Sequence, residues 1–212
     1  MGISERRIRE KKKREGDIVH AAEKVFFNKG FYEATMDDIA EEAELSKGTL
    51  YLYFKSKEDM KYAVFLRAAD KLMKMMEKNI SEWQKGLDKL IAMGETFIDF
   101  SRKYPDYFSI MIYFQSSDIE NMNINRKNIE KYILEKSPLV LVHDAVKKGI
   151  EDGTLRNDID ALTFSNTLWS QMLGLLITVY QKKEILKIFK IDVDTILSTH
   201  FELLINGSKP KK

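Results

Sequence analysis

Residues 35–57 read TMDDIAEEAELSKGTLYLYFKSK, and this stretch decides the fold. Thr35 is followed three residues later by Asp38, a pairing that predicts a helix N-cap with a reciprocal capping partner. Apolar side chains then recur at helical spacing, at Met36, Ile39, Ala40 and Ala43. The first half of the stretch is therefore predicted to be one short amphipathic helix.

The second half predicts another short helix, over residues 47–54. Ser46 is its candidate N-cap, and Leu50 and Phe54 lie four residues apart on its inner side. Two short helices joined by a tight turn indicate a helix-turn-helix, with an ordinary helical hairpin in a core as the alternative. The outer face favours the first interpretation. It carries two tyrosines, a glycine, a threonine and a leucine where a solvated helix would carry Glu and Lys, and these suit a flat, phosphate-rich partner.

The run KGTLYLYFKSKEDM, residues 47–60, resembles the recognition-helix signature of the tetracycline-repressor-like (TetR) family of transcription regulators. The resemblance extends back through IVHAAEKVFFNKGFYEATMDDIAEEAELS, residues 18–46, and so covers about the first sixty residues. One position departs from the family pattern, because Glu44 stands where the family usually has glycine. A positive φ at Glu44 would be mildly strained.

The resemblance implies an all-α fold, with an N-terminal three-helix helix-turn-helix DNA-binding domain and a C-terminal helical bundle for ligand binding and dimerisation. We expect the arm and DNA-binding domain at 1–57, with the helix-turn-helix at about 35–54. The effector-binding and dimerisation domain follows at 58–207, with 57–80 as a connecting helix, and a loose tail at 208–212.

Carried over position by position, the resemblance implies a DNA-facing set of Thr35, Ser46, Lys47, Gly48, Thr49, Tyr51, Leu52, Tyr53 and Lys57. By chemistry, Lys47 suits guanine O6 and N7, and Thr49 or Leu52 suits a thymine methyl. The residues suited to phosphates, which set the register on DNA, are Thr35, Tyr51, Tyr53 and Lys57.

Charge along the 212 residues is segregated, although the formal net charge is only +2. Residues 1–14 hold seven basic and two acidic side chains, 15–46 hold two basic and nine acidic, and 47–57 hold three basic and none acidic. The basic lead-in from Ser4 to Lys13 is either a solvated tail or an arm that reaches along the sugar-phosphate backbone or into a minor groove.

Composition excludes several classes of protein. The chain is 44% hydrophobic and 11% aromatic, which supplies a core and argues against disorder. It has no cysteine, which excludes disulfides, thiolate metal sites and thiol nucleophiles. No apolar run reaches membrane-spanning length and no apolar signal segment follows the basic N-terminus, so we expect a cytoplasmic protein without a membrane partner.

Helix signals continue along the rest of the chain. Ile18, Ala22, Val25 and Phe26 predict a first helix that ends at Gly30. Residues 57–80 contain no proline or glycine and predict a helix of roughly 35 Å that acts as a lever between two domains. Further helices are expected at 86–104, 106–115, 129–149 with a break before Pro138, 161–180, and from Asp194 or Asp192 to about 206, with a polar loop at 116–128.

Catalytic and metal-binding patterns are missing from the sequence. His20, His143 and His200 are scattered without HExxH or HxH spacing, and there is no Gly-rich phosphate loop or GxSxG. We therefore expect no enzyme, no metal site and no cofactor.

Aromatic and methionine side chains beyond residue 90 predict a mostly apolar pocket between bundle helices, with plain helical packing as the alternative. The resemblance implies an effector cavity in this domain but does not choose its residues. The candidates are Phe97, Phe100, Tyr104, Phe108, Met111, Phe114, Trp169 and Met172. Few charged residues belong to this set, so the expected effector is a hydrophobic or amphipathic small molecule.

Two segments, 163–180 and 196–205, are apolar on more than one face. This indicates either fully buried helices or a two-fold four-helix dimer interface. The resemblance implies the second, because the family dimerises through its last two helices. The candidate interface residues are Leu168, Leu175, Leu176, Val179, Ile196, Phe201 and Leu204.

Together with these patterns, the resemblance implies a ligand-responsive repressor that binds double-stranded DNA as a homodimer. Two recognition helices about 34–36 Å apart would require an approximately palindromic operator. Two alternatives stay open. One is an effector-free DNA-binding structural or division-control protein of the same fold, and the other is a small all-helical enzyme or carrier.

Overall fold

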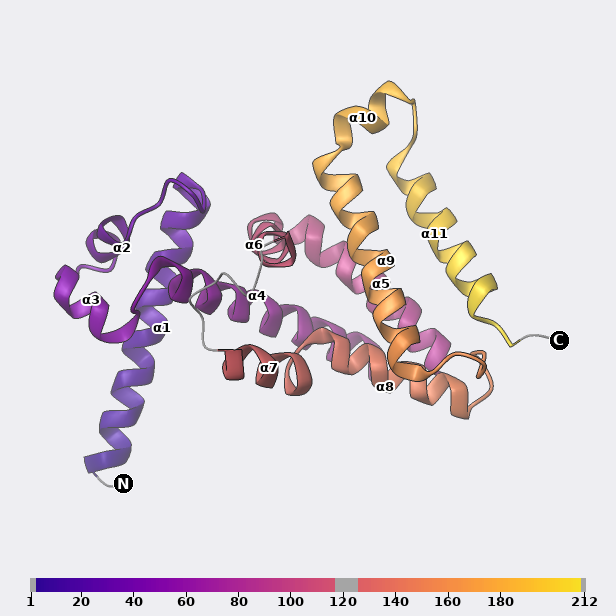
Figure 1. Ribbon diagram of the computed structural model, residues 1–212, viewed down its shortest axis with the longest axis horizontal. Coiled ribbons are helices and arrows are strands. Elements are labelled where there is room, and N and C mark those ends of the chain that lie inside the picture. The colour runs from indigo at the N-terminus through magenta and orange to yellow at the C-terminus, as the bar shows by residue number, and fades with distance from the viewer. Residues whose placement is uncertain (1–2, 117–125, 211–212) are drawn as a thin grey trace. The chain divides into compact units, whose positions relative to one another are not determined.

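The computed structural model describes residues 3–116 and 126–210, and within them every regular element is a helix (Figure 1). This confirms the all-α prediction. The helices are α1 (Ile3–Lys29), α2 (Met36–Glu42), α3 (Lys47–Tyr53), α4 (Lys57–Ile80), α5 (Gly86–Lys103), α6 (Pro105–Ser116), α7 (Arg126–Glu135), α8 (Pro138–Glu151), α9 (Ala161–Gln181), α10 (Lys183–Ile188) and α11 (Val193–Ser208).

By compactness the chain divides into two units. Unit 1 comprises Met1–Ala68 and Asp106–Asn128, and unit 2 comprises Ala69–Pro105 and Ile129–Lys212. Helix α4 therefore contributes its first half to unit 1 and its second half to unit 2. The predicted functional boundary at residue 57 is earlier than this packing boundary and stays a prediction.

Helix α1 corrects the expectation of an arm before the first helix, because the basic lead-in is its first three turns. Arg6 Nε donates to Glu10 Oε1 at 2.8 Å, an i,i+4 pair, and the Lys and Arg residues around it are good helix formers. Further along, Ile18, Ala22 and Phe26 are buried as predicted. Gly30, with φ +87, follows the helix at the C′ position, where its N–H bonds Phe26 O.

Helices α2 and α3 form the predicted helix-turn-helix. Thr35 accepts from Asp38 N while the Asp38 carboxylate accepts from Thr35 N, so the capping box is present. Lys29, which donates to Asp38, and the Thr35 groups lower the pKa of Asp38 to about 2. After α2, Glu44 adopts φ +54, Glu44 N bonds Glu41 O, and Leu45 N bonds Ala40 O. These two bonds make a Schellman turn with a non-glycine residue in the left-handed position.

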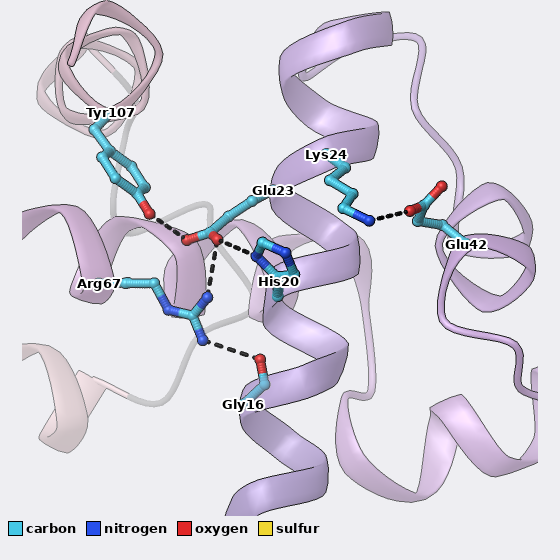
Figure 2. A network of polar contacts seen from close by, with 7 residues as sticks. All are labelled: Gly16, His20, Glu23, Lys24, Glu42, Arg67 and Tyr107. Atoms are coloured by element: carbon cyan, nitrogen blue, oxygen red, sulfur yellow. Dashed lines mark hydrogen bonds and ion pairs between the residues drawn. The ribbon is translucent and has the colours of Figure 1, made fainter. Parts of the chain in front are cut away.

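A buried carboxylate joins three helices within unit 1 (Figure 2). Glu23 of α1 is 5% exposed and accepts from Arg67 of α4 at 2.9 Å and from Tyr107 of α6 at 2.8 Å. Arg67 also donates to Gly16 O at 3.0 Å. The contact sets the positions of α4 and α6 against α1. Sequence patterns did not foresee it, because the three residues are far apart in the chain.

Unit 2 is built around the packing of α5, α8, α9 and α11. Gly86 begins α5 against the last turn of α8, where a Cβ on Gly86 would overlap the backbone of Gly149. The Gly86 N–H donates to Asp152 Oδ2 at 2.9 Å, which caps α5 from a distant part of the chain. Asp160 caps α9 as predicted, and of the two candidates for the last helix Asp192 is the cap.

Several boundaries differ from those expected. A short helix, α10, follows α9 where no helix was predicted. Ser208 does not belong to a loose tail, because it is buried at the end of α11 and its carbonyl accepts from Arg156 N at 2.8 Å. The predicted polar loop at 116–128 lies mostly outside the described residues, and its last three residues are the start of α7.

Candidate nucleic-acid interface

Helix α3 exposes the predicted outer surface, and of the two predicted inner residues Leu50 is buried and Phe54 is half-buried. Leu50 is 0% exposed, whereas Leu52 is 72% and Tyr51 36% exposed. Gly48 faces open space, since a Cβ placed there would meet no heavy atom within 4 Å. A mostly exposed leucine beside a partly exposed tyrosine is unfavourable in water, and it is the composition expected of a face that contacts a partner.

The N-terminus of α3 is fixed by two neighbouring hydroxyls. Ser46 Oγ accepts from Thr49 N at 3.2 Å and lies 2.8 Å from Thr49 Oγ1. Ser46 is therefore the N-cap, as predicted, and part of its hydrogen-bonding capacity is used within the protein. The capping interaction also orients the Thr49 side chain on the same turn as Lys47 and Gly48.

Lys47 is held by an acidic residue of the preceding helix. Its Nζ lies 2.8 Å from Asp37 Oδ1, with the side chains 59% and 65% exposed. The hydrogen bond that Lys47 donates to Asp37 raises the pKa of Lys47, so Lys47 is a cation at neutral pH. An exposed pair of this kind contributes little stability, and an acceptor on DNA can take the place of Asp37.

Lys57 lies in the first turn of α4, where a phosphate contact was predicted. Its Nζ donates to Tyr32 O at 2.8 Å, which leaves two of its three donors for other acceptors. Ser56 caps this helix by accepting from Asp59 N at 3.0 Å, and Asp59 accepts in turn from Lys55 N at 3.1 Å. The bond that closes this turn comes from Lys55 N and not from Ser56 N, so it is not a regular capping box. The Asp59 carboxylate is a negative charge beside the predicted phosphate position.

The remaining predicted DNA-facing residues are the exposed Thr35 at the start of α2 and the half-buried Tyr53 at the end of α3. All nine lie within unit 1. Sequence reasoning missed Asp37, which pairs with Lys47, and Lys55, whose Nζ donates to Tyr51 O at 2.9 Å. The basic character of residues 47–57 was a signal for Lys55, whereas the position of Asp37 depends on how α2 packs against α3.

The predicted ligand set is divided between the two units. Phe108, Met111 and Phe114 belong to unit 1, and the other five residues belong to unit 2. In unit 2, the Phe97 and Trp169 rings stack with centroids 5.1 Å apart and planes at 11°. These two rings and Met172 line an apolar cavity of about 40 Å³, together with Gly94, Phe201 and neighbouring side chains. Phe100 is fully buried and packs against Tyr104.

The predicted interface set also divides into two groups. Leu168, Leu176 and Val179 are buried by their own chain and are core residues of unit 2. These three positions are covered within one chain, and their part in a dimer interface stays a prediction. The other four, Leu175, Ile196, Phe201 and Leu204, are half-buried.

A groove of about 590 Å³ runs between α9 and α11. Leu175 and Leu204 line it, and so does Leu203, which is 69% exposed. His200 lies in the same groove, and its Nε2 is buried without a hydrogen-bond partner. Burial lowers the pKa of His200. The groove is therefore largely apolar, with one neutral imidazole in its wall.

Neither a metal-binding cluster nor a membrane-spanning helix occurs among the described residues. Among them, no group of three or more His, Cys, Asp or Glu side chains is placed to hold a metal ion. None of the helices in residues 3–116 and 126–210 is both long enough and apolar enough to cross a membrane.

Comparison with known proteins agrees with this geometry. The profile of the family described as "Bacterial regulatory proteins, tetR family" matches residues 18–64. The "Fatty acid metabolism regulator protein" of Bacillus subtilis is 24% identical over 200 residues, which are 94% of this chain and 98% of that protein. The "HTH-type transcriptional activator FasR" of Mycolicibacterium smegmatis is 36% identical over 87 residues, 41% of this chain and 40% of that protein.

Among solved structures, the fold is similar to that of the transcriptional regulator FadR from Bacillus subtilis in complex with stearoyl-CoA. The TM-score is 0.71 at 22% identity, covering 90% of this chain and 97% of that one. At this identity the likeness concerns the fold. The matched profile covers α2 and α3 and includes all nine positions predicted to face DNA, from Thr35 to Lys57.

Proposed function

This chain belongs to the TetR family of DNA-binding transcriptional regulators, and from that premise we propose that it is a ligand-responsive repressor that binds a palindromic operator as a homodimer. The observation that carries the proposal is the outer face of α3. It exposes Gly48, Tyr51 and Leu52 between two lysines, Lys47 and Lys57, and buries Leu50 on the other side.

Base recognition is assigned to the first turns of α3. Lys47 exchanges Asp37 for guanine O6 or N7, and Thr49 and Leu52 are suited to a thymine methyl. Gly48 permits the DNA to approach the backbone of α3 closely, because it has no side chain in the space beside it. The phosphate contacts are assigned to Thr35, Tyr51, Tyr53 and Lys57.

The homodimer is assigned to the groove between α9 and α11. Leu203 is 69% and Leu162 is 58% exposed on these two helices, and the groove beside them is largely apolar. A second copy related by a two-fold axis would bury the same surface on both chains. Two α3 helices would then read half-sites about 34–36 Å apart, which is why the operator is a palindrome.

The effector is assigned to the apolar cavity lined by Phe97, Trp169 and Met172, and its class to fatty acyl compounds. The names of the relatives support this class, as does the absence of charged residues from the cavity wall. A volume of about 40 Å³ is far below the roughly 300 Å³ of a typical ligand pocket, so binding must displace side chains. Met76, Met93 and Met172 in the wall are flexible enough to move.

Regulation follows from differential binding. Helix α4 supplies Met76 to the cavity wall and Lys57 to the DNA-facing set. An effector that prefers one position of α4 changes the population of DNA-competent chains. A coupling of roughly 1–3 kcal/mol, typical of such systems, corresponds to a change of about 5- to 150-fold in operator affinity.

Selection of bound DNA from a random pool tests the operator. We expect an enriched palindrome with half-site centres one helical turn apart, and failure to enrich any duplex sequence would overturn the proposal.

The effector assignment can be tested by fluorescence, because the chain has two tryptophans, Trp83 and Trp169. In the Trp83→Phe variant, stearoyl-CoA should change the emission of Trp169 and lower operator affinity, whereas coenzyme A alone should do neither. An operator affinity that stearoyl-CoA binding leaves unchanged would contradict this assignment.

A further inference from the structure

A groove in unit 1 brings the N-terminal turns of α1 beside the end of the recognition helix. Its volume is about 630 Å³. One lining residue, Tyr53, comes from α3, and the others come from the first half of α1. They are Arg7, Glu10, Lys11, Lys13, Arg14 and Asp17. The groove thus joins the most basic segment of the chain to a residue already assigned to phosphate.

The cations of this groove form a fixed row. Arg7, Lys11 and Arg14 have i, i+4, i+7 spacing, so they lie along one face of a continuous helix over roughly 10 Å. That length is about three phosphate-to-phosphate steps along one DNA strand, at about 3.4 Å of axial rise each. Of the acidic residues, Glu10 is paired with Arg6 at 2.8 Å. Four cations, Arg7, Lys11, Lys13 and Arg14, line the groove against two carboxylates, Glu10 and Asp17, so its net charge is positive.

We propose that this groove binds the sugar-phosphate backbone of the same duplex whose bases face α3. The inference rests on the proposed DNA-binding function and extends it to a surface outside the helix-turn-helix. The open groove has solvent-exposed cations, which suits an extended polyanion. The helical conformation of this segment holds the charges in place, so no ordering of a flexible arm opposes binding.

The test compares two matched double variants in the full chain. Lys11→Gln with Arg14→Gln removes two cations that line the groove. Arg9→Gln with Lys12→Gln removes one Arg and one Lys at the same spacing from the same helix, but neither residue lines the groove. Glutamine is a good helix former, and circular dichroism confirms that α1 persists. The probe is a random-sequence duplex of about 30 base pairs, roughly three helical turns, titrated at several salt concentrations.

In the Lys11→Gln, Arg14→Gln double variant, the slope of log K against log salt should become smaller in magnitude by about 1.8. The affinity of this variant for the duplex should fall by more than roughly tenfold. The Arg9/Lys12 variant should change the slope by less than half as much. Tyr53→Phe should weaken binding without changing the slope, since it removes no charge. Equal slopes for the two double variants would overturn this inference and leave the proposed function standing. Failure of the wild-type chain to bind any duplex would instead remove the proposed function.

Discussion

Lys47, the first residue of α3, is ion-paired with Asp37 in the first turn of α2, with 2.8 Å between Nζ and Oδ1. The residue best placed to read a base is thus held by the other helix of the helix-turn-helix. DNA must displace Asp37 from Lys47, so the two substitutions at this pair should act in opposite directions.

Lys47→Ala should weaken operator binding by roughly tenfold and relax the preference at one base position, because a base contact is lost. Asp37→Asn should strengthen binding to all sequences by roughly two- to fivefold, because it releases Lys47 and removes a negative charge near the phosphates. Binding measured against a set of single-base operator variants separates the two effects. A Lys47→Ala protein with an unaltered base preference would show that Lys47 does not read a base.

Lys57→Ala should weaken binding to all sequences alike and reduce the salt slope by about 1, as expected for one lost phosphate contact. Lys74→Ala is the matched control on α4, because Lys74 is exposed and paired with Asp70. The melting temperature must also be followed, since Lys57 donates to Tyr32 O. If the non-specific affinity and salt slope of Lys57→Ala match those of the control, Lys57 does not bind phosphate.

Glu44→Gly should stabilise the protein by about 0.5 kcal/mol. The left-handed conformation costs a non-glycine residue about 1–2 kcal/mol, and the extra freedom of glycine in the unfolded chain offsets part of the gain. Lys190→Gly is an independent test of the same effect, because Lys190 also has a positive φ, +55, after α10. Denaturant titration measures both changes. Glu41→Gly within α2 is the opposite control and should destabilise the protein, by about 1 kcal/mol.

Glu23→Ala should destabilise the protein by about 3 kcal/mol, because it leaves Arg67 and the Tyr107 hydroxyl without their shared acceptor (Figure 2). Adding Arg67→Met to the Glu23→Ala variant should restore part of this loss, since no unpaired charge then remains beside the space that the Glu23 side chain leaves. The two single variants and the double variant form a cycle that measures the coupling. Strictly additive losses would show that the Glu23–Arg67 contact contributes no coupling energy.

The stability of the protein should fall on acidification through His200. Burial lowers the pKa of His200 below the ordinary 6.5, so the folded chain binds this proton less readily than the unfolded chain. The contribution of the neutral imidazole is present above pH 6.5 and is lost as the pH falls through the lowered folded pKa. In His200→Gln this part of the pH dependence should vanish. If the free energy of unfolding of the wild-type chain and of His200→Gln varied identically between pH 7 and pH 5, His200 would be excluded as the source of this pH dependence.

The helix-turn-helix could be predicted in detail because its signals act over four residues or fewer. Thr35 and Ser46 cap their helices through bonds to the third residue along, whereas the positive φ of Glu44 was expected from the resemblance to the family. The alternation of Leu50 and Leu52 between inside and outside follows from the helical period alone. For the same reason the caps at Asp160 and Asp192 were within reach of sequence reasoning.

The sequence by itself therefore determined the all-helical class, the position of the recognition helix and the residues on its outer face. Only the tertiary structure decided which sides of α9 are covered, how the predicted aromatic set divides between two units, and that Asp37 holds Lys47. It also showed the basic lead-in to be a helix that lines a groove with Tyr53. The physical reason is that a cap or a helical stripe is complete within a few residues, whereas burial and ion pairing between helices depend on the packing of distant segments.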